Sequence, residues 1–407
     1  MKIRAVTTFF DPALPDAPSP AQLAACSQEI TTALQSAGWQ VQSQRVATAP
    51  FAGWLNGYPR DEWPQRIHAL AKESTRLGWQ YLSIGPALPD APADFELLPA
   101  LLAHDETLFT AGIIAAGAHL YPAAAKAAAR VITANAQQTP DGFTNLRFAA
   151  LANVGPGAPF LPAAYAQSQQ PPAVALAIEC ADEAVQAFSQ APSLEDAGQR
   201  LLHALESNAR AIQQVVESIC TKHRVAFGGF DFSPAPYPDI WCSLGKAIEL
   251  LGVPTLGMGG SLAAAAWLAS LLDQGTWQRA GFNGLMLPVL EDYTLAQRAA
   301  NGMLTIKDLL LYSAVCGTGL DTIPLAGDTS SEALSAILLD LGALAVRLNK
   351  PLTARLMPIP GKQVGDRTEF EFEFFANSRV MDAAAEKIRA PLLDAPIIEI
   401  FPRKHRE

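Results

Sequence analysis

The sequence predicts an α/β protein built around a parallel sheet, and three features support this prediction. Half of the 407 residues are apolar, which is enough for a sizeable core. Short apolar runs of β-type residues alternate along the chain with windows of helical periodicity. Two helical windows are each followed by Gly-Trp-Gln and a strand-like run, near residues 38–41 and 78–84, as in successive βα units.

The first elements follow from local signals. Residues 2–10 are rich in β-formers and predict a strand. Ser19 is expected to cap a helix that has Pro20 at its first position, and apolar residues at three- and four-residue spacing continue it towards Gly38. A strand is expected to begin at Trp39. A second helix over residues 61–77 is expected to precede a strand over residues 79–84.

The later elements are predicted in the same way. Strands are expected near residues 145–151, 173–178, 224–230 and 284–290, and helices near residues 122–136, 194–220, 240–251 and 261–272. Thr329 and Glu332 match a capping box at the start of a helix that reaches residue 348. Residues 355–358 and 368–374 are expected to pair as strands, and the strict Phe/Glu alternation of the second places the rings on the core face.

The alternation of elements leaves open a doubly wound open sheet or a closed barrel. No low-complexity linker interrupts the chain, so we expect a single domain over residues 1–407. A homodimer is expected from the apolar composition and the size.

Charge and cysteine usage argue against several classes of protein. The chain has 29 Lys and Arg against 39 Asp and Glu, and no basic block that could neutralise a row of phosphates, so nucleic acid is not an expected partner. The amino terminus lacks the apolar stretch of a signal peptide, and residues 261–272 are too short to cross a bilayer, so we expect a cytoplasmic protein without a membrane partner. The five cysteines form no CxxC pair and are expected to be reduced thiols.

Ligands of α/β proteins collect where strands end, so Gly, Asp and Asn residues there are the first candidates for a site. Asn153 opens a loop of glycines and prolines and is a candidate ligand-binding residue; the loop is alternatively a rigid turn that packs Phe160 and Tyr165. Gly229 and Asp231 lie near the end of a predicted strand. A desolvated carboxylate there would have a shifted pKa or need a cation, unless Asp231 only caps a turn.

A third candidate segment spans residues 316–328. Cys316 has glycines beside it, including Gly317 and Gly319, so its thiol is expected to be accessible and to be a candidate nucleophile. Asp321 and Asp328 could together bind a cation or act as acid and base. Alternatively, Asp328 only precedes the next helix.

The last candidate loop covers residues 360–366. Lys362 could hold an anion, and Asp366 a cation or a hydroxyl group. Exposed loops often carry such a pair for no catalytic reason.

Taken in order, these motifs resemble a family of uncharacterised bacterial and archaeal proteins, domain of unknown function 711, which is related to UPF0210. The matching segments are residues 3–7, 153–160, 162–165, 228–233, 316–321, 327–329, 360–362 and 365–366. The resemblance implies a ten-stranded α/β barrel with helices outside and a loop that enters it, similar to the barrel of the glycyl radical enzymes pyruvate formate-lyase and anaerobic ribonucleotide reductase. It implies no established reaction. Gly361 and Gly365 lack the Arg-Val lead and the following aromatic residue of a glycyl radical motif, which argues against radical catalysis.

The leading functional hypothesis is an enzyme that acts on a small anionic metabolite in the barrel mouth without a glycyl radical. Three carboxylates would supply acid-base groups or hold a divalent metal ion: Asp231, Asp321 and Asp366. Arg355 and Lys362 would meet the anion, and Cys316 is the possible nucleophile. The alternative is a non-catalytic ligand sensor or an oligomeric scaffold on the same fold.

Overall fold

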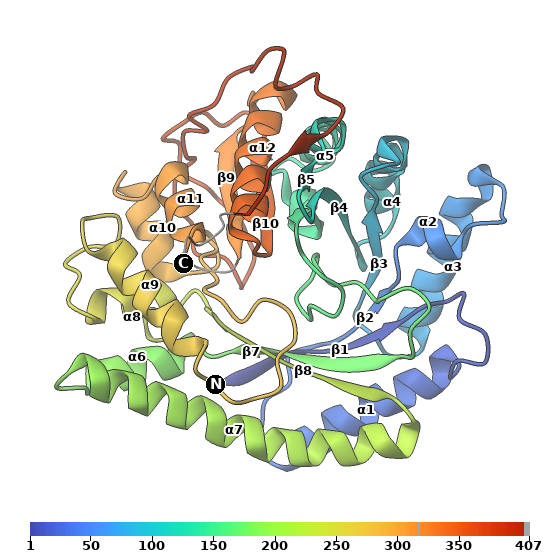
Figure 1. The fold of residues 1–407 in the computed structure, drawn as a ribbon, viewed down its shortest axis with the longest axis horizontal. Coiled ribbons are helices and arrows are strands. Elements are labelled where there is room, and N and C mark those ends of the chain that lie inside the picture. Colours follow the sequence, from blue (N-terminus) through green and yellow to red (C-terminus); the bar gives the residue numbers. More distant parts are fainter. Residues whose placement is uncertain (316–317, 403–407) are drawn as a thin grey trace.

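The computed structural model describes residues 1–315 and 318–402, and its centre is a mixed sheet of eleven strands (Figure 1). The strands are β1 (Lys2–Phe10), β2 (Gln44–Thr48), β3 (Tyr81–Ala87), β4 (Leu108–Ala116), β5 (His119–Leu120), β6 (Phe148–Ala152), β7 (Ala173–Glu179), β8 (Ala226–Ala235), β9 (Gly319–Ala326), β10 (Leu352–Ile359) and β11 (Ile398–Glu399). Nine of them follow one another in the order β8-β7-β1-β2-β3-β4-β6-β10-β9, while β5 pairs with β4 and β11.

The sheet contains two sets of strands that run in opposite directions. Strands β1, β2, β3, β4 and β6 are parallel to one another. At one side β7 pairs antiparallel with β1, and β8 is parallel to β7. At the other side β10 pairs antiparallel with β6, and β9 is parallel to β10. The amino-terminal ends of the first set therefore meet the carboxyl-terminal ends of β7 and β8.

The ladder does not close between β8 and β9, so the ten-stranded barrel implied by the family resemblance is not confirmed. The segment between these two strands approaches each of them by single bridges, from Arg279 to Phe230 of β8 and from Pro288 to Asp321 of β9. The strand predicted at residues 284–290 is therefore not regular: this segment pairs with its neighbours only through isolated bridges. What the structure establishes is a mixed α/β fold with a curved sheet.

Helices lie on the outer side of the curved sheet (Figure 1). They are α1 (Pro20–Ser36), α2 (Phe51–Trp54), α3 (Trp63–Arg76), α4 (Leu98–His104), α5 (Pro122–Ala136), α6 (Ala181–Ser189), α7 (Leu194–His223), α8 (Leu244–Leu250), α9 (Ser261–Leu272), α10 (Tyr293–Ala300), α11 (Ile306–Ser313) and α12 (Ser331–Leu348), with short 3₁₀ turns at η1 (Arg60–Glu62), η2 (Pro92–Leu97), η3 (Phe143–Arg147) and η4 (Ile240–Cys242). The main core forms where their apolar faces meet the sheet. Within the described chain, no helix combines the length and apolar character needed to cross a bilayer.

Several elements match their prediction. The first strand, β1, has the predicted bounds, and so do α5 and α9. The cap of α1 is also confirmed: the Ser19 hydroxyl accepts from the backbone of Gln22, whose side chain accepts from the backbone of Ser19.

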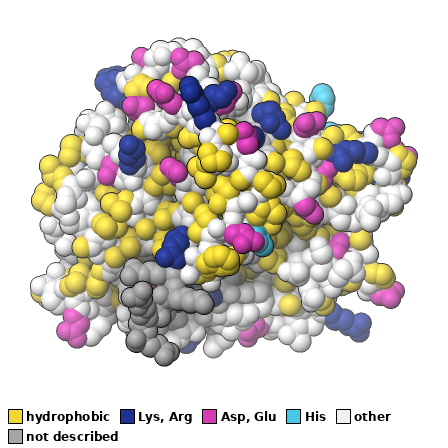
Figure 2. Space-filling model, turned by 45° about the horizontal axis from the view of Figure 1, so that its top comes forward, with side chains coloured by type: hydrophobic (Ala, Val, Ile, Leu, Met, Phe, Trp, Pro, Cys, Tyr) yellow, Lys and Arg dark blue, Asp and Glu magenta, His cyan; other side chains and the backbone are white. Residues whose placement is uncertain are grey.

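On the face in Figure 2, basic and acidic side chains are interspersed among apolar ones.

Other predictions need correction. The strand expected from Trp39 begins at Gln44, and the helix cap expected at Thr329 is Ser330, whose hydroxyl accepts from the amide of Ala333 at 3.1 Å. Residues 368–374 form no regular strand, because the Asn377 side chain takes both backbone groups of Phe370, at 2.8 and 3.2 Å, where a strand partner would bond. The Phe/Glu alternation nevertheless places each ring inward, and the glutamates are exposed.

A loop at residues 153–166 enters the concave side of the sheet and is fixed to three strands. Thr7 of β1 donates from its hydroxyl to the carbonyl of Pro159 at 2.9 Å. Ser83 of β3 donates to the carbonyl of Ala164 at 2.7 Å. The amide of Ala166 donates to the carbonyl of Thr48 in β2 at 2.9 Å. This loop therefore forms part of the interior.

Gly319 offers a test of how closely β9 and β10 approach. Gly319 and Gly252 share a φ of +97°, but a Cβ at Gly319 would lie 2.3 Å from the carbonyl oxygen of Thr353, whereas one at Gly252 would meet nothing within 4 Å. Both alanine substitutions carry the cost of a positive φ, and only Gly319→Ala also forces two backbones apart. We expect Gly319→Ala to lower the free energy of unfolding by about 2 kcal/mol more than Gly252→Ala, measured by urea denaturation. Equal losses would contradict the close approach.

Candidate functional site

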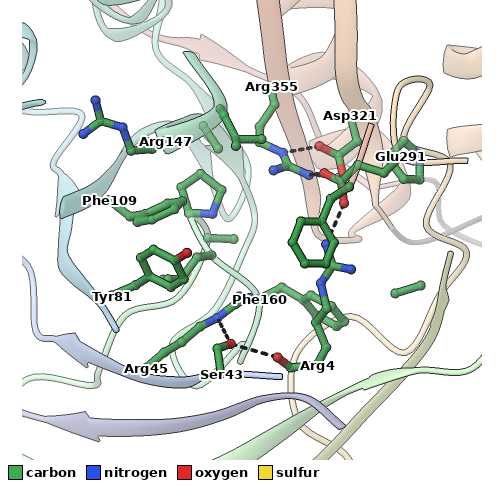
Figure 3. Close-up of a pocket in the computed structure, with 18 of the residues that line it drawn as sticks. Arg4, Ser43, Arg45, Tyr81, Phe109, Arg147, Phe160, Glu291, Asp321 and Arg355 are labelled. Carbon is green, nitrogen blue, oxygen red and sulfur yellow. Dashed lines mark hydrogen bonds and ion pairs between the residues drawn. The ribbon is translucent and has the colours of Figure 1, made fainter. Parts of the chain in front are cut away.

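A cavity of about 630 Å³ lies on the concave side of the sheet (Figure 3). Its wall includes residues near the amino-terminal ends of β1, β2, β3, β4 and β6, the inner loop at residues 160–163, and residues from the second half of the chain. Much of that wall is aromatic: Tyr81, Phe109, Phe143, Phe160, Phe282, Phe372 and Phe374. The cavity has the size and apolar character of a small-molecule site.

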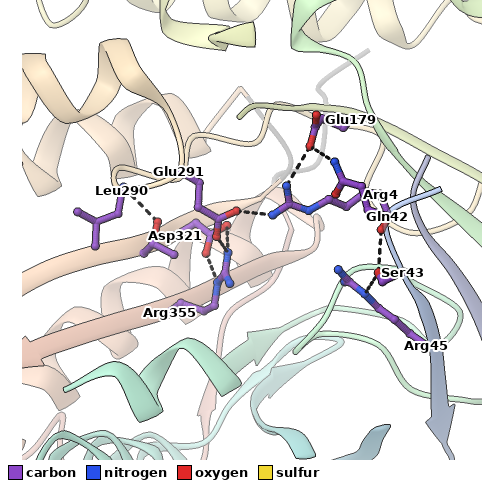
Figure 4. A network of polar contacts seen from close by, with 10 residues as sticks. Arg4, Gln42, Ser43, Arg45, Glu179, Leu290, Glu291, Asp321 and Arg355 are labelled. Carbon is purple, nitrogen blue, oxygen red and sulfur yellow. Dashed lines mark hydrogen bonds and ion pairs between the residues drawn. The ribbon is translucent and has the colours of Figure 1, made fainter. Parts of the chain in front are cut away.

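Two arginines and three carboxylates form an ion network along one side of the cavity (Figure 4). Arg4 donates to Glu179 at 3.0 Å and to Glu291 at 2.9 Å. Arg355 donates to Glu291 at 2.7 Å and makes a two-pronged pair with Asp321. Glu291 therefore bridges the two guanidinium groups.

The pKa shifts of Glu291 and Arg355 favour the ionised form of both residues. Burial alone would raise the pKa of Glu291, but the charges of Arg355 and Arg4 outweigh it and hold that pKa below its ordinary range. Burial would also lower the pKa of Arg355, yet Asp321 and Glu291 raise it instead. At neutral pH Glu291 and Arg355 are therefore both charged.

Irregular strand pairing brings both arginines into this network. The register between β1 and β7 shifts between Ile3 and Ala5, around Arg4. The register between β10 and β9 shifts between Ala354 and Leu356, around Arg355. A β-bulge re-aims the side chain where it occurs, which explains why charged residues leave the regular alternation at these two places.

A third arginine, Arg45, faces the cavity in a different electrostatic situation. Its Nε donates to the Ser43 hydroxyl at 2.9 Å, and its guanidinium carbon lies 5.8 Å from the ring centre of Tyr81. Within residues 1–315 and 318–402, no carboxylate forms an ion pair with it. Burial, with the nearby charge of Arg4, lowers the pKa of Arg45 to about 9. Arg45 is thus a partly buried cation that lacks a counter-charge.

Arg147 also borders the cavity, but its guanidinium is used for structure. It donates to the backbone carbonyls of Leu102 at 2.9 Å, Asp105 at 2.6 Å and Leu108 at 3.4 Å. Burial lowers its pKa. In Figure 3 its guanidinium points away from the Asp321 side of the cavity.

Among the predicted site residues that the structure describes, Asp321 and Arg355 are brought together at the cavity. Asp231 lies elsewhere: it is fully buried in β8 and accepts from the amides of Ser233, Phe282 and Asn283 at 3.0, 2.7 and 3.0 Å. Burial raises its pKa, and these hydrogen bonds oppose the change. The carboxylate of Asp231 therefore holds the segment after β8 against that strand.

The predicted glycines lie where backbones approach closely. Gly229 has a φ of +112°, and a Cβ there would lie 2.6 Å from the carbonyl oxygen of Gln278. Gly319 begins β9 and meets Thr353 in the same way. Cys316 and Gly317 lie outside the described residues.

Asn153, Lys362 and Asp366 are not part of the cavity wall. The Asn153 side chain donates to the carbonyl of Ala345 at 3.2 Å. Lys362 pairs with the exposed Glu369, and Asp366 accepts from the amide of Gln363 at 2.8 Å within its own loop. These three residues therefore lie apart from Asp321 and Arg355.

In the described part of the chain, no group of three or more His, Cys, Asp or Glu side chains could hold the expected divalent metal ion. The cavity carboxylates Glu291 and Asp321 already have arginine partners. A metal ion at these oxygens would have to displace a guanidinium group.

Sequence reasoning did not select Arg4, Arg45 or Glu291. A signal was available for the arginines, because each lies beside apolar residues of a short strand-like run, at 3–6 and 45–47. A charge on the buried face of a strand needs a partner, and this marks it for attention. Glu291 has no such pattern around it.

Replacing Glu291 tests whether the buried network supports the fold. We expect Glu291→Gln to lower the free energy of unfolding by about 3 kcal/mol at neutral pH, because it leaves Arg4 and Arg355 short of a counter-charge. Since the folded-state pKa of Glu291 is lowered, its contribution is present above its ordinary pKa of 4.5 and is lost as the pH falls through the folded value.

Urea denaturation between pH 3 and pH 8 measures both effects. The matched control is Glu369→Gln, which breaks the exposed pair with Lys362 and should leave the midpoint unchanged. A network without energetic importance would make the two variants behave alike.

Comparisons with known proteins are consistent with the motifs. The family model described as "Uncharacterised ACR (DUF711)" matches residues 1–377, which confirms the resemblance that the motifs predict. A UPF0210 protein of Pyrobaculum arsenaticum is 35% identical over 259 residues, which cover 61% of this chain and 57% of that relative. A UPF0210 protein of Oleidesulfovibrio alaskensis is 26% identical over 357 residues, covering 82% of this chain and 77% of the relative.

The match to the Pyrobaculum protein thus spans little more than half the length of that curated relative. Among solved structures, an anaerobic ribonucleotide reductase aligns with 87% of this chain and 70% of its own, with 7% sequence identity and a TM-score of 0.34. That score is too low to establish a shared fold.

Proposed function

We propose that this chain, which belongs to the DUF711 family of uncharacterised proteins, is an enzyme that binds a small organic anion in its cavity through Arg45. The observation that carries the proposal is the unbalanced charge of Arg45. An unpaired buried charge destabilises a fold, and the guanidinium faces open space that a ligand can fill. A bound carboxylate or phosphate supplies the missing counter-charge.

The neighbouring ion network supports a catalytic role. Arg4, Glu291, Asp321 and Arg355 line the same cavity and are held by one another. Charges fixed before the ligand arrives can stabilise a transition state without reorganisation. We therefore assign Asp321 and Arg355 to orienting and polarising the bound anion.

The sheet is also proposed to form one domain, a ten-stranded barrel in which residues 278–290 act as an irregular tenth strand. This proposal is supported by the position of the segment between β8 and β9. The amide of Ala280 donates to the backbone carbonyl of Phe230 in β8 at 2.8 Å, and the amide of Val289 donates to the backbone carbonyl of Asp321 in β9 at 3.0 Å. A crystal structure with this segment away from either strand would refute it.

Replacing Arg45 tests ligand binding. Thermal shift assays at constant ionic strength would use a panel of sodium salts: acetate, pyruvate, benzoate, succinate and phosphate. We expect at least one anion to raise the Tm of the wild type, and Arg45→Gln to weaken its binding by about 100-fold, the loss of one charge-assisted pair. Without ligand, Arg45→Gln should be more stable than the wild type by about 1 kcal/mol, because it removes an uncompensated charge.

Arg76→Gln is the matched control, since Arg76 pairs with Glu73 on the exposed side of α3. It should bind as the wild type does. Undiminished binding by Arg45→Gln would refute the role given to Arg45.

The lowered pKa of Arg45 also predicts a pH dependence of binding. We expect the guanidinium to be charged below a pH of about 9 and to lose its proton above it. Affinity for an anion should therefore be constant from pH 6 to pH 8 and fall about tenfold per pH unit above about 9. Titration calorimetry measures this fall, and residual binding by Arg45→Gln should not show it.

Catalysis is distinguished from sensing by the fate of the ligand. The purified protein would be incubated with a small-molecule cell extract, and metabolites followed by mass spectrometry. An enzyme depletes its substrate and forms a product, whereas a sensor returns the bound anion unchanged. Binding that depends on Arg45 without any conversion would leave the anion site standing and refute catalysis.

A further inference from the structure

We infer that the bound anion is a monocarboxylate that carries an aromatic ring, with its carboxylate on Arg45 and its ring beside Tyr81 and Phe109. The inference rests on the proposed function and names the class of its ligand.

Of the arginines on the cavity wall, one guanidinium is left without a direct partner. Arg4 and Arg355 are already paired with carboxylates, and Arg147 is satisfied by backbone carbonyls. Among the described residues that border the cavity, Arg45 is the arginine left with neither. A dianion would place its second charge in the same poorly solvated space as Glu291, where it has no cation to meet.

The free edge of Arg45 suits a carboxylate. Its Nε is used by Ser43, and in the described chain neither terminal nitrogen has a hydrogen-bond partner. The two terminal nitrogens of a guanidinium match the two oxygens of a carboxylate in a planar, two-pronged pair. Ser43 in turn donates to the carbonyl of Arg4 at 2.9 Å, so the hydrogen bonds of this residue help to fix the guanidinium.

The wall beside this edge consists of rings. Tyr81 lies against the Arg45 guanidinium, and its ring meets that of Phe109 edge to face, with centres 5.3 Å apart. Figure 3 shows Tyr81 and Phe109 on the same side of the cavity as Arg45. Phe109 also packs in an apolar cluster with Leu161 of the inner loop. A flat ring attached to the carboxylate would pack against these rings, whereas a short polar anion would leave them uncovered.

Titration calorimetry on the full chain tests the inference with four probes at constant ionic strength: phenylacetate, hexanoate, succinate and phenyl phosphate. We expect phenylacetate to bind at least tenfold more tightly than each of the others. Phe109→Leu, which keeps an apolar side chain and removes the ring, should weaken phenylacetate about tenfold and hexanoate less than threefold. Phe188→Leu is the matched control, since Phe188 is a buried ring of α6 packed against Trp267, away from the cavity.

The possible failures are distinguishable. If anions bind only when Arg45 is present, but succinate or phenyl phosphate equals or exceeds phenylacetate, the ligand class is wrong and the anion site stands. Equal tightness of hexanoate and phenylacetate overturns the aromatic part alone. Binding that is indifferent to Arg45→Gln overturns the proposed function itself. A circular dichroism spectrum establishes that each variant is folded, and Phe109→Tyr replaces Phe109→Leu if that variant is not.

Discussion

The carboxylate of Glu291 joins strands that the hydrogen bonds of the sheet keep far apart. It binds Arg4 of β1 and Arg355 of β10, and four strands separate these two in the ladder. Such a contact requires the sheet to curve until its ends face each other. The same carboxylate follows the irregular segment between β8 and β9, where the ladder is incomplete. An ion network therefore spans the interior at the place where backbone pairing is weakest.

Arg45 differs from the other arginines of the cavity because the ion network includes no carboxylate partner for it. Glu291 and Asp321 pair with Arg4 and Arg355, whereas Arg45 has no ion-pair partner among the described residues, and burial lowers the pKa of its guanidinium. A packed apolar residue at this position would cost the fold less. The ligand proposed above would supply the counter-charge that this position lacks.

Local signals predicted the elements that depend on local physics. The Ser19 cap and the Pro20 start define α1 without reference to the rest of the chain. Local signals gave the wrong structure for residues 319–326, where the glycines and Asp321 favoured a loop. The segment is a buried strand because β10 and the segment before β9 pair with it. Residues 368–374 failed in the opposite sense, since Asn377 replaces the expected strand partner. In both cases a contact distant in sequence decided the outcome.

The site was only half predictable for a geometric reason. Sequence reasoning looked to loops at strand ends and selected Asp321 there, and it added Arg355 from a predicted strand. The structure places both residues inside β9 and β10, and Arg4 and Arg45 lie inside β1 and β2, where no loop motif marks them. Which strand residues face one cavity depends on the assembled sheet and cannot be read from a single strand.

The glycine and aspartate motifs acquire a physical explanation from the incomplete ladder. Gly229 lets the carbonyl of Gln278 approach β8, and Asp231 holds the amides of Phe282 and Asn283 beside it. Gly319 does the same for β9 and β10. Gly229 and Asp231 lie where regular hydrogen bonding between β8 and β9 is interrupted, whereas Gly319 permits the close pairing of β9 with β10. The segment that joins β8 and β9 at this interruption ends beside Glu291 and bonds to Asp321, and it thereby positions both carboxylates at the cavity. The motifs that identify the family thus support the position of the charges, while Arg45 supplies the cation that a ligand would meet.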